Sequence, residues 1–96
     1  MMKFMVVEVR EVTVEDFEVV YTDLMANIGE LVTEEHPELA GIAIEKAKAK
    51  LNKLKTITSS LVVKDKDEFS YVEGKFAKAV TRFILAANMK GYRVCF

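Results

Sequence analysis

The fold is decided by residues 13–37, which read TVEDFEVVYTDLMANIGELVTEEHP. Thr13 can cap a helix, and Asp16 follows at the third helical position as an acidic variant of the capping box. Apolar residues then recur at helical spacing, which gives a stripe about 120° wide. They are Phe17, Val20, Tyr21, Leu24, Ile28, Leu31 and Val32. Pro37 disfavours helical geometry in the residue before it and suits the first position of a new helix. The stretch therefore predicts one core-facing helix and the start of a second.

A second apolar stripe follows Pro37 and resembles a short coiled-coil seam. Its members recur every seven residues at Ala40, Ala47, Leu54 and Leu61, with Ile44, Leu51 and Thr58 between them. Residues 56–63 are rich in β-branched side chains, which favour strands over helices. The sequence leaves open whether this part prolongs the helix or forms a strand.

A third helix is predicted after the polar turn at residues 64–68, with Asp65 or Asp67 as its N-cap. Phenylalanines recur every seven residues along it, at Phe69, Phe76 and Phe83. Gly91 is expected to end it. Residues 3–12 and 92–96 alternate between apolar and polar side chains, which predicts a strand at each end of the chain.

Together these elements predict an α+β domain that is predominantly helical. The expected order is strand, helix, helix, possible strand, helix, strand. The terminal strands are expected to pair, and the three amphipathic helices to pack together. No linker or repeat divides the sequence, so residues 1–96 are expected to form a single domain.

Composition narrows the classes of partner and setting. The net charge is −1, which gives no overall attraction to nucleic acid or to an anionic membrane. Cys95 is the one cysteine, so an intramolecular disulfide is excluded and a cytoplasmic setting is expected. The apolar run at residues 4–7 is followed at once by charged residues, which argues against a signal peptide or a membrane span.

The charges are split between the first two predicted helices. Residues 13–36 hold seven acidic residues and no Lys or Arg, whereas residues 37–64 hold six Lys and two Glu. One interpretation is that the two helices lie antiparallel and that their flanking charges complement each other. The other is that each charged face binds a partner macromolecule.

No pattern in the sequence indicates catalysis, a cofactor or a metal. The residues nearest to a metal-ligand cluster are Glu30, Glu34, Glu35, His36 and Glu38. A di-iron site needs a Glu three residues before the His, where this chain has Thr33. We therefore expect a protein that is not an enzyme and that binds no cofactor.

The preferred functional hypothesis is a small regulatory or interaction module that forms homo-oligomers and binds a partner protein through charged helix faces. Its acidic partner face would include Asp23, Glu30 and Glu34. A seam between copies would use Phe69, Phe76 and Phe83, because a chain of this size has little other surface to cover two apolar stripes.

Two other functions stay open. The first is binding of a small anionic ligand, such as a nucleotide, at a subunit interface. It would use Lys46, Lys50, Lys53 or Arg82. The second is nucleic-acid binding through the lysine ridge of residues 46–55. That ridge has no Arg and no aromatic residue for base stacking, and a strongly acidic segment precedes it, which disfavours this function.

Overall fold

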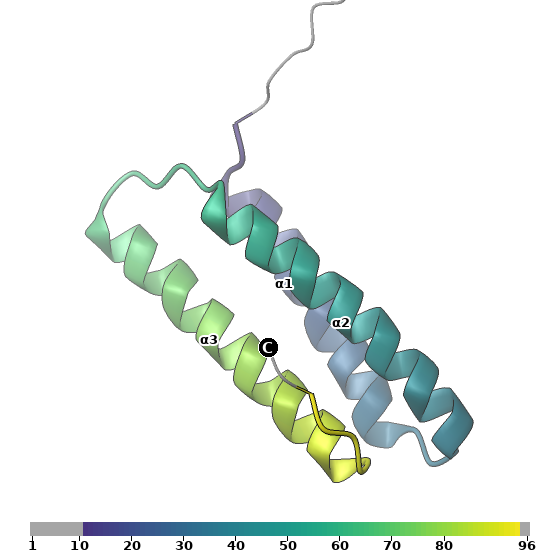
Figure 1. Ribbon diagram of the computed structural model, residues 1–96. Coiled ribbons are helices and arrows are strands. Elements are labelled where there is room, and N and C mark those ends of the chain that lie inside the picture. The colour runs from purple at the N-terminus through teal and green to yellow at the C-terminus, as the bar shows by residue number, and fades with distance from the viewer. Residues whose placement is uncertain (1–10, 95–96) are drawn as a thin grey trace, which may run out of the picture.

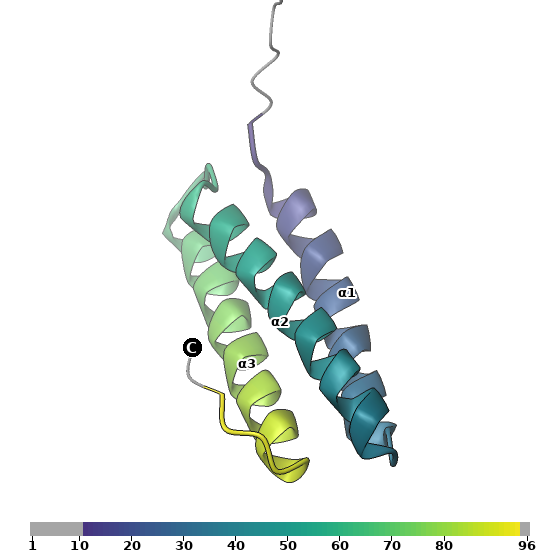
Figure 2. The same ribbon diagram turned by 45° about the vertical axis from the view of Figure 1, so that its right-hand side comes forward.

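Three long helices form an antiparallel bundle in the computed structural model, which describes residues 11–94. They are α1 (Val14–Thr33), α2 (Pro37–Ser59) and α3 (Lys66–Met89). Each helix packs against both of the others, and consecutive helices run in opposite directions (Figures 1 and 2). Within the described residues the fold is therefore a helical bundle.

The helix boundaries follow local signals in the sequence. The Thr13 hydroxyl accepts a hydrogen bond from the Asp16 amide, and the Asp16 carboxylate accepts one from the Thr13 amide, so the predicted capping box at the start of α1 is confirmed. Pro37 is the first residue of α2, and Asp65 caps α3 through the amide of Glu68. These caps satisfy amide groups that have no partner inside the helix.

Gly91 ends α3, as predicted. Its φ of 83° lies in the left-handed region, which glycine adopts at little cost. The Gly91 amide donates to the carbonyl of Asn88 and the Tyr92 amide to that of Ala87, which is the bond pattern of a Schellman motif. The chain beyond α3 is thereby turned back along the bundle.

The core lies between the three helices and consists of apolar side chains. They are Phe17, Val20, Leu24, Ile28 and Leu31 from α1, Ala40, Ala43, Ile44, Ala47, Leu51 and Leu54 from α2, and Val72, Ala79, Phe83, Ala86 and Ala87 from α3. No polar side chain of the described residues is buried there. The predicted helical stripes thus supply the core, and removal of their apolar surface from water is the main stabilising contribution.

The β-branched segment that the sequence left open is divided between two structures. Helix α2 continues to Ser59, and the hydroxyls of Thr56 and Thr58 donate to carbonyls one turn earlier, at Asn52 and Leu54. These bonds satisfy the hydroxyls within the helix. The chain is extended after Ser60 and makes a single parallel bridge between Leu61 and Val12.

The α+β prediction is wrong, because residues 11–94 contain three helices and no sheet. Most of the strand predicted at residues 3–12 lies outside the described residues. Its last residue, Val12, bridges to Leu61 and not to the C-terminal segment. Residues 92–94 of the predicted closing strand are not in a strand, and residues 95–96 lie outside the described range.

The expected pairing of the two ends fails for a geometric reason. With three antiparallel helices, the start of α1 and the end of α3 lie at opposite ends of the bundle (Figure 1). The alternation at residues 92–96 covers only five positions, and such a short pattern is easily overridden by tertiary contacts.

Candidate protein-interaction surface

The surface between each pair of helices is covered to a different extent. The described part of the C-terminal segment folds back between α2 and α3 (Figure 1). Val94 packs against the core there, and the Tyr92 hydroxyl donates to the carbonyl of Pro37 over 3.4 Å. A Cβ placed on Gly41 would lie 3.1 Å from that hydroxyl, so the absent side chain makes room for Tyr92. The other two helix pairs carry the charged candidate site residues.

The α1–α2 face brings the two oppositely charged segments together. Lys50 forms an ion pair with Asp23 over 3.7 Å. Toward one end of this face Lys46 lines the same groove as Glu30 and Glu34. The charged side chains are exposed here, so each such contact stabilises the fold by at most about 1 kcal/mol. Its main effect is to favour pairing of α1 with α2 over other helix arrangements. This arrangement fits the interpretation that the charge split pairs α1 with α2.

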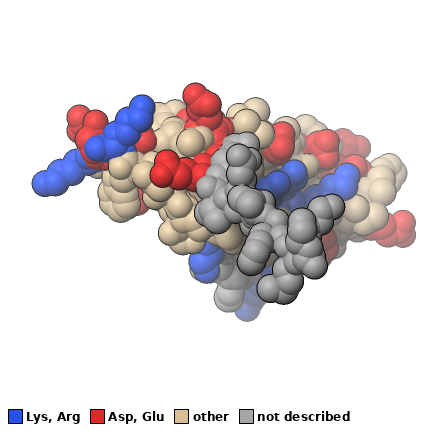
Figure 3. All heavy atoms as spheres, turned by 90° about the horizontal axis from the view of Figure 1, so that it is seen from above, with Lys and Arg blue, Asp and Glu red and all other residues tan. Residues whose placement is uncertain are grey.

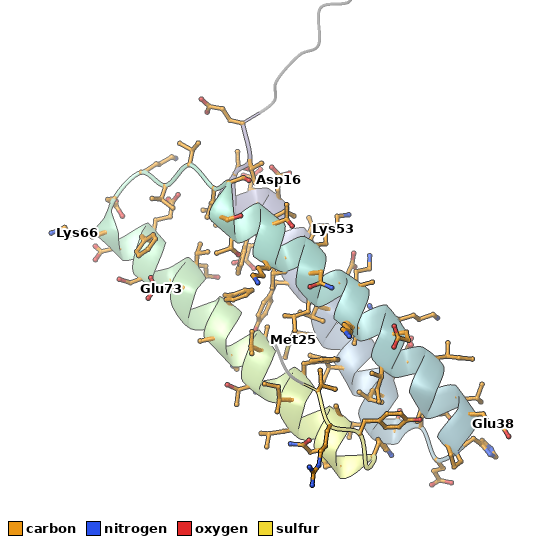
Figure 4. The ribbon with its side chains drawn as sticks, in the orientation of Figure 1. Asp16, Met25, Glu38, Lys53, Lys66 and Glu73 are labelled. Carbon is orange, nitrogen blue, oxygen red and sulfur yellow. The ribbon has the colours of Figure 1, made fainter. Side chains whose placement is uncertain are left out.

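Toward the other end of the α1–α2 face, Lys53 and Asp16 line a second groove of about 360 Å³ together with the exposed Val19. The labelled side chains of Asp16 and Lys53 both lie near the end where α1 begins (Figure 4). In the view from above, basic and acidic side chains are mixed and not separated by sign (Figure 3). The predicted lysine site and the predicted acidic partner face therefore share one surface.

This placement bears on the two alternative functions. Acidic residues beside Lys46, Lys50 and Lys53 lower the positive potential that would attract a phosphate or a nucleic acid. Arg82, the fourth residue of the predicted anion site, lies between α1 and α3 and is not brought together with the lysines. Anionic-ligand and nucleic-acid binding remain predictions without a built site in the described residues.

One end of the α1–α3 contact is polar. Glu18 of α1 accepts a hydrogen bond from the Tyr71 hydroxyl of α3 and lies 3.3 Å from the ammonium group of Lys75. The same ammonium group lies 4.8 Å from the ring centres of Tyr71 and Tyr21, within range of a cation–π interaction. These four side chains form a clamp between the two helices, which we call the Glu18 clamp.

The Glu18 clamp changes two pKa values. The Tyr71 hydrogen bond has the largest effect and lowers the pKa of Glu18; burial opposes it, and the hydrogen bond and charge of Lys75 lower the pKa further. The Tyr71 hydroxyl, followed by Glu18, raises the pKa of Lys75. Both shifts favour the charged forms. The clamp is thus a satisfied structural contact, and it occupies the acidic side chain that α1 presents on this side.

The other end of the α1–α3 contact is an open apolar groove of about 370 Å³, which we call the α1–α3 groove. It is lined by Met25, Ile28, Gly29, Val32 and Thr33 from α1 and by Arg82, Leu85, Ala86 and Met89 from α3. Met25 lies about midway along the bundle (Figure 4). Leu85 and Met89 are 58% and 68% exposed, and Val32 is 40% exposed. Apolar side chains of this size, gathered at one place, are typical of an interaction surface.

The phenylalanine series proposed as a seam between copies has three different environments. Phe83 is fully buried in the core of its own chain, Phe76 is partly buried, and Phe69 is 55% exposed. Phe69 lines a small hollow of about 110 Å³ with Leu61 and Val72, away from the α1–α3 groove. Of the three, Phe69 offers the most surface, and the seam remains a prediction.

Sequence reasoning missed the α1–α3 groove and the Glu18 clamp. Val32 was assigned to the core stripe, and Met25, Leu85 and Met89 were not singled out. A signal for the groove does exist in the sequence. Met25 and Val32 are seven residues apart, and Leu85 and Met89 are four apart, so each pair lies on one helical face beside the core stripe. What the sequence does not show is that α3 brings its pair next to that of α1.

The described residues were also considered as a metal site and as membrane-spanning helices. Within residues 11–94 no three His, Cys, Asp or Glu side chains are grouped so that they could hold a metal ion. None of α1, α2 and α3 combines the length and apolar character that crossing a membrane requires. Comparisons with known protein families, curated protein sequences and solved structures gave no match to this chain.

Proposed function

We propose that this protein is a non-enzymatic interaction module that binds another protein through the α1–α3 groove. The observation that carries the proposal is the exposure of Leu85, Met89 and Val32 at one place on the surface. Complete burial of such a side chain contributes about 1.5–3 kcal/mol, so roughly half of that is still to be gained at each of the more exposed ones. A partner that covers the groove would supply it.

The proposal keeps the interaction module expected from the sequence but assigns partner binding to a different surface. The charged faces that suggested a partner carry both signs, and Lys50 and Asp23 pair within the chain. The residues that line the α1–α3 groove form no such ion pair with one another, because Arg82 is the one charged side chain among them. The setting that we propose is the cytoplasm, because the sequence has a single cysteine and a disulfide cannot form within it.

Glycine substitutions offer a test that leaves the fold intact. Gly29 lines the groove, and Gly74 lies on α3 outside it; a Cβ at either position would meet no atom within 4 Å. Gly29→Gln and Gly74→Gln should each stabilise a helix by about 0.5–1 kcal/mol, since glycine is a poor helix former. Only Gly29→Gln adds bulk inside the groove.

The experiment captures proteins from extracts of the source cells on the immobilised full chain, with wild type, Gly29→Gln and Gly74→Gln in parallel. We expect a defined set of proteins to be retained by wild type and Gly74→Gln and lost with Gly29→Gln. Thermal unfolding checks that both variants are at least as stable as wild type. Equal retention by all three chains, or specific retention by none, would contradict the proposed function.

A further inference from the structure

The edges of the α1–α3 groove carry one sign of charge. Arg82 lines the groove and has no ion-pair partner among residues 11–94. The exposed Lys78 precedes it by one helical turn on α3, so the two cations are neighbours on the helix surface. On the α1 side the groove is lined by uncharged residues that include Gly29 and Thr33, and Glu18 is held in its clamp. An occupant therefore meets a basic edge on α3 and a neutral edge on α1.

The shape of the groove favours a helix as its occupant. Its floor and walls follow two antiparallel helices, with apolar residues at positions 25, 28 and 32 on one and at 85, 86 and 89 on the other. This spacing leaves a lengthwise channel into which the side-chain ridge of a third helix can pack. The space above Gly29 is open, which lets the backbone of that helix approach α1 closely.

From these two features we infer that the α1–α3 groove binds an amphipathic helix of a different protein, with acidic side chains along one edge of its apolar face. The apolar face would cover Met25, Leu85 and Met89, and the acidic edge would lie against Arg82 and Lys78. The bound helix would complete a four-helix bundle. This inference rests on the proposed function and specifies the chemistry of the partner.

Charge argues against a second copy of this chain as the occupant. If two copies met groove to groove, the edges brought together would be neutral or basic, and the two Arg82 side chains would gain no acidic partner. The acidic residues Asp23 and Glu30 of α1 lie on the α1–α2 face, mixed with lysines. Like charges across an interface work against association, so a partner that brings its own acidic edge fits better.

The test uses the ¹⁵N-labelled full chain and two synthetic amphipathic peptides of roughly 18 residues, long enough to form a helix on binding. The peptides share one apolar face, and the flanking positions are all Glu in one and all Lys in the other. Binding is followed by amide chemical shifts at low salt. We expect saturable shifts at Gly29, Arg82 and Leu85, with the Glu peptide bound about five- to tenfold more tightly than the Lys peptide.

Charge reversal sharpens the test. Arg82→Glu should abolish the preference for the Glu peptide, because it leaves a Glu beside Lys78 on that edge, whereas Lys48→Glu, the same charge change on an exposed residue of α2 outside the groove, should keep the preference. Raising the salt concentration should narrow the difference between the peptides, because screening weakens exposed charge pairs. Circular dichroism of both variants verifies that the helices are retained.

Three results with the peptides would overturn the inference. They are equal binding of both peptides, shifts confined to residues outside the groove, and no saturable shift with either peptide. Self-association of the wild-type chain in sedimentation experiments, abolished by Gly29→Gln, would make a second copy the occupant and overturn it as well. Equal binding of both peptides at the groove removes the acidic partner but leaves the proposed function standing, whereas the capture experiment tests that function independently.

Discussion

Helix α1 is bound to its two neighbours by contacts of different kinds. Toward α2 it presents acidic residues that face lysines, as in the Asp23–Lys50 ion pair. Toward α3 it forms the Glu18 clamp at one end and leaves the apolar α1–α3 groove open at the other. On the α1–α2 face the exposed charges find partners within the chain, whereas at the α1–α3 groove apolar side chains beside the core stripe remain exposed without one.

The largest effect should come from removing the core that both interfaces share. Phe83 is fully buried in α3, so Phe83→Ala should lower the free energy of unfolding by about 3–5 kcal/mol through lost burial and the cavity left behind. Phe69, the first member of the same seven-residue series, is 55% exposed, and Phe69→Ala should cost about 1 kcal/mol or less. Urea unfolding of both variants measures the difference.

If Phe69→Ala were as damaging as Phe83→Ala, the described arrangement of α3 would be wrong. Similar small losses for both would mean that α3 is not anchored through Phe83. Either outcome would also remove the basis for the α1–α3 groove, because the groove depends on the position of α3.

The helices themselves could be predicted from the sequence because their signals are local. Thr13 with Asp16 and the break at Pro37 set boundaries through bonds within a few residues, and the structure keeps them. The terminal strands could not be excluded in this way. The alternation after Gly91 predicts a strand, but Gly91 turns the chain back so that Tyr92 meets Pro37 and Gly41, and that contact is not local.

The candidate surface was less predictable than the fold, for a related reason. The apolar stripe of α1 is wider than the area that α2 and α3 cover, so Val32 belongs to the stripe in the sequence but remains 40% exposed. The acidic and basic segments, in contrast, indicated that α1 and α2 are neighbours. Charge patterns predict pairs of elements, whereas the uncovered part of an apolar stripe depends on where the third element packs.

A smaller effect is expected from the Asp23–Lys50 ion pair between α1 and α2. Asp23→Lys and Lys50→Glu should each lower the free energy of unfolding by about 0.5–1 kcal/mol, since each puts a like charge opposite an exposed partner. The double variant restores an opposite pair and should recover most of the loss. A double-mutant cycle by urea unfolding measures the coupling, and a double variant that shows only the sum of both losses would mean that the two residues do not interact.

The smallest and most specific effect should come from Tyr71→Phe in the Glu18 clamp. The substitution removes the hydroxyl that lowers the pKa of Glu18 and keeps the aromatic ring beside Lys75. We expect the pKa of Glu18 to rise toward its usual value, measured by NMR titration of its carboxyl group. The effect on stability should remain below about 1 kcal/mol, as for other partly exposed pairs.

The pH dependence of this loss follows from linkage. A carboxyl group whose pKa is lower in the folded state stabilises the fold above its unfolded pKa, and that contribution is lost as the pH falls through the folded pKa. The usual value for Glu18 is 4.5, so wild type should exceed Tyr71→Phe in stability at pH 7, and the gap should close as the pH falls below 4.5 and through the folded pKa. A gap in stability that stayed constant down to pH 3 would mean that the loss comes from packing of the hydroxyl and not from the charge of Glu18. The Glu18 clamp would then contribute no electrostatic stabilisation to the α1–α3 contact.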